Sequence, residues 1–383
     1  MVYHIFPAKD LFEDRRLMSS KAVKCNADLR LLRHLAEAGT GFDCASIREM
    51  QLVRSVGVDS SRIILANPCK AASVLCAARE MGVTKMVYDN MDELDSIKRF
   101  SPNAQLFLRI HADDEEALIH FGDKFGAPLE TAPALLERAW TLGLQVIGIS
   151  FHVGVLTPFS RIPMDYTDLG LTNTHEKGTG ASNIQAFIDP IQRARIIFDF
   201  AASKGHPLQC LDIGGGFQDL NFEAMAASIN HGVKLHVPAG VQLIAEPGRY
   251  YARDAYTLVC KVISRRRQIG ENQTMLENSA SNPDMLYQND GVFGHFMNVL
   301  IENETFQPMV ATKTPDLTPS SPSREQREHW YSIWGPTCDS TDCLGRKVRM
   351  ESEVKVGDWL VYKNMGGKFS SLPPQALSGI KVN

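Results

Sequence analysis

The sequence predicts an α/β protein, in which a closed (β/α)8 barrel is followed by a mostly β C-terminal domain. Between residues 20 and 251, short apolar runs of strand character alternate with segments of helical periodicity, and the pair occurs eight times. Eight such units favour a closed barrel, which takes roughly 250 residues, over an open doubly wound sheet. From 252 to 383 the alternation ends, and β-rich segments with turn residues predict a second domain.

Each expected barrel strand is a short run rich in apolar residues. In the first, KAVKCN, strand alternation places Lys21 on the side opposite to Lys24. Amphipathic segments such as ADLRLLRHLAEAG and IREMQLVRSVG lie between strands, and several end in the glycine that favours a helix C-cap. The expected strands are 21–26, 41–46, 62–68, 85–90, 106–112, 145–154, 208–217 and 241–250.

Composition excludes several functional classes. The chain has 383 residues, 44% of them hydrophobic and 22% charged, and a net charge of −4, which argues against a nucleic-acid groove. No apolar run is long enough for a bilayer span, and the N-terminus lacks the pattern of a signal peptide. The eight cysteines form neither a C-x-x-C pair nor a zinc-like spacing with histidine. We expect a cytoplasmic protein with reduced thiols, no metal site and no membrane contact.

Polar residues stand where the expected strands end. In a (β/α)8 barrel the carboxyl ends of the strands form the active-site mouth. A bland alternative remains for each position taken alone, because strands often end in polar residues where the chain exits to solvent. Eight strands that end this way favour a site. The residues are Lys24, Asp43, Asn67, Arg109, His152, Gly214, Gly215, Gly216, Glu246 and Arg249.

The last two expected strands predict an anion site. Three glycines in LDIGGGF follow the seventh strand, and AEPGRYY supplies Arg249 after the eighth. Backbone N–H groups of glycine turns bind anions, and the loops after strands seven and eight form the usual phosphate site of such barrels. A phosphate site beside a lysine and an acid suits pyridoxal 5'-phosphate (PLP), whose aldehyde needs an amine and whose ring nitrogen needs a charged partner.

These requirements assign roles to three strand-end residues. Lys24 is expected to form the Schiff base, with a pKa lowered by burial. Glu246 is expected to pair with the ring nitrogen, and His152 to stack on the ring. Lys21 is expected to be a solvated surface residue, since it faces the other way.

Ten motifs resemble the eukaryotic ornithine decarboxylase family. They are AVKCN, GTGFDCAS, ANPCK, LRI, FHVG, LDIGGGF, AEPGRYY, NDGV, WGPTCDSTD and VGDW, and they extend from about residue 20 to 370. The resemblance implies a fold-type III PLP enzyme with a TIM-like, alanine-racemase-like barrel. It implies three regions: an N-terminal segment 1–19 that is a truncated part of the β domain, a PLP-binding barrel 20–251, and a C-terminal β domain 252–383.

The resemblance also implies residue roles. Cys338 matches the thiol that returns a proton to the substrate's α-carbon, and Asp339 matches an acid that holds its distal amine. Both would act across the interface of a homodimer with shared sites. Glu49 matches a supporting polar residue. The implied cofactor-binding residues are Lys24, Asp43, Arg109, His152, Thr179, Gly215, Gly216, Glu246, Pro247, Gly248, Arg249 and Lys368.

Four departures from the family pattern bear on activity. Residues 155–178 are an insertion that we expect to have no secondary structure of its own. We interpret this insertion as a retained intron or gene-model error, or else as a genuine surface loop. After it, Thr179 supplies the phosphate-binding hydroxyl. The chain starts late, so the β domain is expected to lack a strand. Lys368 replaces a tyrosine on the phosphate. In the substrate region Phe293 replaces a tyrosine, and Ile301 and Glu302 replace a Tyr-Asp pair.

Two functional classes therefore stay open. The first is decarboxylation of a basic amino acid, L-ornithine to putrescine for polyamine biosynthesis, or of lysine, arginine or another substrate. The second is a non-catalytic paralogue that resembles the antizyme inhibitors. The implied partners are a small amino acid, a second copy of the chain and an antizyme-like regulator, whereas nucleic acid and membrane are excluded.

Overall fold

The structure is a computed structural model that describes residues 17–112, 117–119, 124–153, 155–156, 185–217, 222–269, 277–311 and 328–367. The chain divides into two compact units, Met1–Tyr251 and Ala252–Asn383. The Pro/Ser/Thr-rich and charged stretch 311–327, which the sequence predicts to be an exposed loop, lies outside the described residues except for Ala311. Most of segment 1–19 lies outside them too. Within the described ranges, none of the helices combines the length and apolar character needed to cross a membrane.

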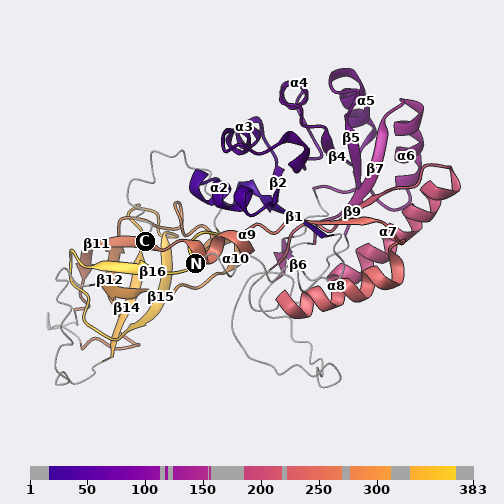
Figure 1. The fold of residues 1–383 in the computed structure, drawn as a ribbon. Coiled ribbons are helices and arrows are strands. Elements are labelled where there is room, and N and C mark those ends of the chain that lie inside the picture. Colours follow the sequence, from indigo (N-terminus) through magenta and orange to yellow (C-terminus); the bar gives the residue numbers. More distant parts are fainter. Residues whose placement is uncertain are drawn as a thin grey trace. The chain divides into compact units, whose positions relative to one another are not determined.

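The first unit is a closed barrel of eight parallel strands, which confirms the predicted fold class (Figure 1). Neighbouring strands follow the order β1-β10-β9-β7-β5-β4-β3-β2. The strands are β1 (Leu17–Ala22), β2 (Gly41–Cys44), β3 (Ile63–Leu65), β4 (Lys85–Tyr88), β5 (Gln105–Arg109), β7 (Gln145–Ser150), β9 (Cys210–Asp212) and β10 (Gln242–Ala245).

The first strand begins and ends earlier than predicted. β1 stops at Ala22, and Val23–Cys25 forms a 3₁₀ turn that Asn26 N closes on Val23 O at 3.0 Å. Residues 17–19, which we expected in the N-terminal segment, therefore lie in the barrel. The prediction of a solvated Lys21 is wrong: its side chain is fully buried, and Nζ donates a 2.8 Å hydrogen bond to Gly248 O.

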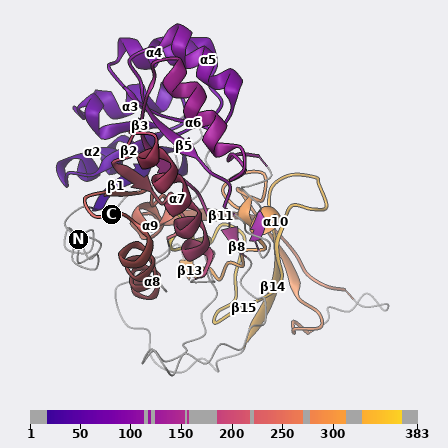
Figure 2. The same cartoon turned by 90° about the vertical axis from the view of Figure 1, so that its right-hand side faces the viewer.

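Helices cover the outside of the strand ring, and Figure 2 shows α4, α5 and α6 side by side there. Polar side chains start several of them; Asp28 accepts from Arg30 N, Ser46 from Glu49 N and Asn90 from Glu93 N. Buried apolar side chains on one face then hold each helix to the barrel. The barrel helices are α2 (Leu29–Glu37), α3 (Ile47–Ser55), α4 (Ala72–Glu80), α5 (Met91–Phe100), α6 (Ala132–Thr141), α7 (Gln185–Ser203), α8 (Phe222–His236) and α9 (Arg249–Ala252).

Apolar side chains fill the barrel below its mouth. A cluster of buried residues from the strands closes the interior, so the ring is a packed core and not a channel. A Cβ at Gly148 would lie 2.6 Å from Cys210 O, so this position tolerates only glycine without a shift of the neighbouring strand. The cluster contains Met18, Ile64, Ala66, Val87, Phe107, Ile147, Cys210 and Ile244.

A two-stranded antiparallel sheet joins β6 (Ala117–Ile119) to β8 (Val155–Leu156). β8 is the start of the segment 155–178, which we expected to have no secondary structure. That expectation is wrong for these two residues, because pairing with β6 holds them as a strand. Residues 157–178 lie outside the described residues.

The second unit contains a six-stranded sheet in the order β13-β16-β11-β12-β14-β15. Only the β12–β14 pair is parallel among the described strands of this sheet. The short helix α10 (Asn298–Glu302) precedes β13. The strands are β11 (Leu258–Arg266), β12 (Asp284–Gln288), β13 (Met309–Ala311), β14 (His329–Trp334), β15 (Cys343–Met350) and β16 (Trp359–Tyr362).

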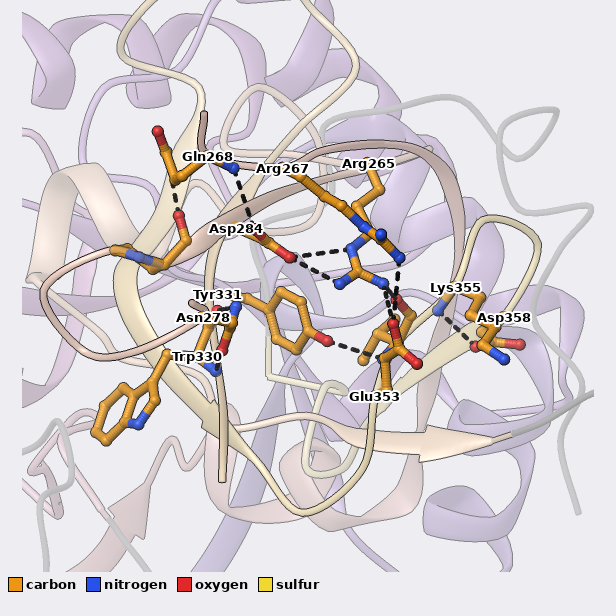
Figure 3. A network of polar contacts seen from close by, with 12 residues as sticks. Arg265, Arg267, Gln268, Asn278, Asp284, Trp330, Tyr331, Glu353, Lys355 and Asp358 are labelled. Atoms are coloured by element: carbon orange, nitrogen blue, oxygen red, sulfur yellow. Dashed lines mark hydrogen bonds and ion pairs between the residues drawn. The ribbon is translucent and has the colours of Figure 1, made fainter. Parts of the chain in front are cut away.

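A polar network fastens the sheet to the turn before β16 (Figure 3). Arg265 on β11 is the hub: Nη2 donates to Asp284 Oδ2 at 2.7 Å, and Nη1 donates to Glu353 Oε1 at 2.8 Å and to Val354 O at 2.9 Å. Val354 N in turn donates to the Tyr331 hydroxyl at 2.9 Å. Because the Arg265 side chain is largely buried, these charge-assisted bonds are expected to stabilise this unit.

Candidate active site

The carboxyl ends of the barrel strands gather most of the predicted polar residues at one mouth. Lys24 follows β1, Asp43 lies on β2, Arg109 ends β5, His152 follows β7 and Glu246 follows β10. The pKa values of these groups respond to one another, so their charges lie within electrostatic range. The barrel thus brings the expected amine, ring-stacking histidine and acid together.

Lys24 and Asp43 form an ion pair. Nζ lies 3.6 Å from Asp43 Oδ2; the lysine side chain is 49% exposed and the aspartate only 1%. The Asp43 carboxylate raises the pKa of Lys24, and this attraction outweighs burial, which acts in the opposite direction. Our prediction of a lowered pKa is therefore wrong. Burial, reinforced by Glu246, raises the pKa of Asp43 to about 6.

His152 is held as a neutral ring between the glycine turn and Glu246. Gly215 N donates to Nδ1 at 3.4 Å, which requires a lone pair there and leaves the ring proton on Nε2. Nε2 lies 2.9 Å from Glu246 Oε2. Burial, aided by the positive charges of Arg109 and Lys24, lowers the pKa of His152 well below its usual value.

Asp212 is a site residue that the sequence analysis missed. It ends β9, is fully buried, and accepts a 3.0 Å hydrogen bond from Gly214 N at Oδ1. Burial, followed by the neighbouring Glu246, raises the pKa of Asp212 well above the ordinary value. Its place directly before the glycines in LDIGGG, at a strand end, was the signal that could have found it.

The glycine turn has no room for side chains. Gly214 has φ +64°, and a Cβ there would lie 2.4 Å from Phe151 O and 2.7 Å from His152 Nδ1. Gly216 also adopts a positive φ, of +99°. Glu246 N donates to Gly214 O at 2.6 Å, so the turn is fixed against the residues that follow β10. Backbone, and not side chains, therefore lines this side of the mouth, as close approach of an anion requires.

Two further predicted residues have structural partners of their own. The guanidinium of Arg109 lies over the Phe125 ring, with Cζ 5.2 Å from its centroid. Glu49 lies in the first turn of α3, where Oε2 accepts from Ala45 N at 2.5 Å. Together with the Ser46 cap, this bond explains Glu49 as a helix-start residue.

Five other predicted residues belong to the second unit or fall outside the described residues. Cys338 and Asp339 lie in the second unit and are exposed, and Asp339 Oδ1 accepts from Thr341 N at 2.8 Å. Glu302 is fully buried within α10. Thr179 and Lys368 fall outside the described residues. For these residues the sequence-based roles stay predictions.

A comparison with protein families decides the assignment of the barrel. Residues 8–157 and 172–253 match the family described as pyridoxal-dependent decarboxylase, pyridoxal binding domain. The chain belongs to this family. The unmatched residues 158–171 fall inside the predicted insertion 155–178. The predicted family, the PLP cofactor and the class of amino-acid decarboxylase are thereby confirmed.

Relatives and solved structures agree with the family. The chain is 41% identical to ornithine decarboxylase of Neurospora crassa, over 90% of this chain and 70% of that protein. It is 38% identical to antizyme inhibitor 2 of Xenopus laevis, with the same coverage of 90% and 70%. The arginine decarboxylase of Paramecium bursaria Chlorella virus, bound to agmatine, superposes with a TM-score of 0.79 at 31% identity, over 97% of this chain and 89% of that one.

The barrel mouth fits PLP. A structure of SrLDC in complex with PLP and cadaverine shares 28% identity and a TM-score of 0.74, over 96% of this chain and 83% of that chain. Among the described residues, no N–H or O–H group is aligned on either carboxyl oxygen of Glu246, although the side chain is almost fully buried. A buried acid in this state calls for a donor such as a protonated ring nitrogen. Lys24 supplies an amine, and the side-chain-free glycine turn a place for phosphate.

Proposed function

We propose that this decarboxylase acts on a basic amino acid and that L-ornithine is the substrate, giving putrescine for polyamine biosynthesis. The observation that carries the proposal is the intact mouth of the barrel, with its Lys24–Asp43 pair, neutral His152 and buried Glu246. The 41% identity with an ornithine decarboxylase supports the choice of ornithine. We also place the protein in the cytoplasm.

When bound, the cofactor supplies an aldehyde and an electron-accepting ring. Lys24 Nζ is the amine that binds the aldehyde. Asp43 Oδ2, 3.6 Å away, holds and orients the Nζ group through the ion pair. Because burial and Glu246 raise the pKa of Asp43 to about 6, this carboxyl can take up and release a proton near neutral pH.

The other mouth residues orient the ring. Glu246, whose oxygens have no aligned donor in the described part of the chain, would pair with the ring nitrogen. His152 would lie against the ring as a neutral imidazole and would add no positive charge there. The glycine turn 214–216 and the segment Glu246 to Arg249 hold the phosphate, assisted by Thr179 and Lys368.

The substrate end of the site comes from the second unit. Cys338 returns a proton to the α-carbon, and Asp339 holds the distal amine; both belong to the partner chain of a homodimer. The exposure of both side chains in one chain supports such a contact. Glu302 is the second acid for the distal amine.

The test combines a cofactor titration with product detection. Purified protein is titrated with PLP and scanned for the absorbance band of the lysine-bound cofactor. Carbon dioxide is then measured with ornithine, lysine and arginine. We expect the absorbance band to form, and carbon dioxide to be released faster from ornithine than from lysine or arginine. The Lys24→Ala variant serves as the control, because it must lose the band. Faster release of carbon dioxide from lysine or arginine would refute ornithine as the preferred substrate but would leave the assignment as a decarboxylase intact.

A second function has specific support in the 38% identity with antizyme inhibitor 2. Under this alternative the chain binds an antizyme-like regulator and does no chemistry. A cofactor-free spectrum together with no gas from any of the three amino acids would favour it. The intact Lys24, His152 and Glu246 argue for the enzyme.

A further inference from the structure

Two buried carboxyl groups meet at the ends of β9 and β10. Asp212 is the last residue of β9 and pairs in register with Ile244, two residues before Glu246. The backbone bond from Glu246 N to Gly214 O, 2.6 Å long, continues this pairing past both strand ends. Asp212 is fully buried and Glu246 is 1% exposed, so both carboxyls are shielded from bulk water.

The contact lacks the donors that two carboxylates would need. Asp212 Oδ1 accepts from Gly214 N at 3.0 Å, but for Oδ2 and both oxygens of Glu246 no aligned donor exists among the described residues. The pairing of β9 with β10 nevertheless places the two carboxyls at neighbouring strand ends, where each acts on the pKa of the other. Ionised carboxylates only accept hydrogen bonds and repel each other, so such a contact is favourable only when one group carries a proton.

The surroundings decide which group is protonated. Glu246 faces the positive charges of Lys24 and Arg109, and the neutral His152 at 2.9 Å. Burial and the acidic Glu246 and Asp43 raise the pKa of Asp212, whereas the N–H of Gly214 and the guanidinium of Arg109 act in the opposite direction. Positive neighbours favour the ionised form of Glu246, whereas negative neighbours favour the neutral form of Asp212.

We propose that Asp212 is a positioning residue that stays protonated, donates its carboxyl proton to Glu246, and thereby fixes Glu246 as a single negative charge. In agreement, burial raises the pKa of both carboxyls, and the pKa of Asp212 lies well above its usual range. One oxygen of Glu246 binds Asp212, and the other is left for a cationic donor. The use of that oxygen by the ring nitrogen rests on the proposed function; the shared proton does not.

The shared proton is tested on cofactor-free protein by carbon-13 NMR of labelled aspartate carboxyl groups at pH 7. We expect one aspartate signal in the protonated range, which Asp212→Asn removes. The matched control Asp43→Asn, which alters another buried acid of the mouth, must keep that signal. Absence of a protonated aspartate, or its survival in Asp212→Asn, would overturn the proposal.

A variant of Glu246 provides a second test in case Asp212→Asn does not fold. In Glu246→Gln the new side-chain amide donates to Asp212, so we expect the Asp212 signal to move to the ionised position. An Asp212 signal that stays in the protonated range in the Glu246→Gln variant would contradict the shared hydrogen bond.

The positioning role is tested by PLP affinity, measured from the absorbance titration. Asp212→Asn keeps a donor for Glu246, so its affinity should stay within about threefold of wild type, whereas Asp212→Ala should lose about tenfold or more. Equal losses in both variants would refute the positioning role. If wild-type protein shows the protonated aspartate but does not bind PLP, the proposed function fails and the shared proton stands.

Discussion

Substitution of Gly214 by alanine tests the close packing of the glycine turn. Gly214 has φ +64°, which costs an L-residue about 1 kcal/mol. The new Cβ would also lie 2.4 Å from Phe151 O and 2.7 Å from His152 Nδ1, so backbone must move. Overpacking of this kind costs about 2 kcal/mol more. We expect Gly214→Ala to lower the free energy of unfolding by about 3 kcal/mol.

Gly205 provides a matched control. It has φ +80° but nothing within 4 Å of a Cβ, so Gly205→Ala isolates the backbone strain and should cost about 1 kcal/mol. Urea unfolding of the cofactor-free protein measures the free energy of unfolding of both variants. The dependence of this free energy on urea concentration should be the same as in the wild type. PLP affinity should fall only in Gly214→Ala, because only that turn faces the site. Equal losses of stability in the two variants would refute the close approach, and unchanged PLP affinity would refute its role in binding.

Three further predictions concern buried charges and the second unit. Burial lowers the pKa of Lys21, so the unfolded chain binds more protons than the folded chain. The free energy of unfolding of the wild type should therefore rise with pH toward the ordinary lysine pKa, by up to about 1.4 kcal/mol per pH unit. Unfolding of Lys21→Met measured between pH 7 and 10 should lack this rise. Burial raises the pKa of Asp43 to about 6, so the folded state binds more protons than the unfolded state between pH 4 and 6. The free energy of unfolding of the wild type should fall by about 3 kcal/mol as the pH rises through this range. Asp43→Asn should not show this fall, and a pH–stability profile parallel to that of the wild type would contradict the shift. Asp342 is buried and accepts hydrogen bonds from Val292 N at 2.9 Å, from Thr337 N at 3.0 Å and from Thr337 Oγ1 at 2.7 Å. Asp342→Ala should therefore lower the free energy of unfolding in urea by about 3 kcal/mol. The control Asp339→Ala, at an exposed position, should lower it by less than about 1 kcal/mol.

The sequence was sufficient for the barrel because its evidence is local. Apolar runs and helical periodicity repeat eight times, and the eight strands occur where those runs lie. The boundaries were less certain: the first strand ends at Ala22, since Val23–Cys25 turns into a 3₁₀ helix. That turn, and not strand alternation, carries Lys24 to the mouth.

The misread residues depend on neighbours that are distant in sequence. The buried Lys21 has its hydrogen-bond acceptor 227 residues away in the sequence, at the carbonyl of Gly248. The pKa of Lys24 rises because β2 places Asp43 beside it, which no pattern around residue 24 reveals. For Asp212 the position before the glycines was a local signal, but its place beside Glu246 depends on the pairing of β9 with β10.

The central claim is that Lys24 is the amine that binds PLP. Borohydride reduction of the PLP-loaded protein, followed by mass spectrometry of its peptides, tests this most directly. We expect a single reduced pyridoxyl group, on Lys24. Attachment to another lysine such as the buried Lys21, or no stable adduct in protein that has bound the cofactor, would contradict it.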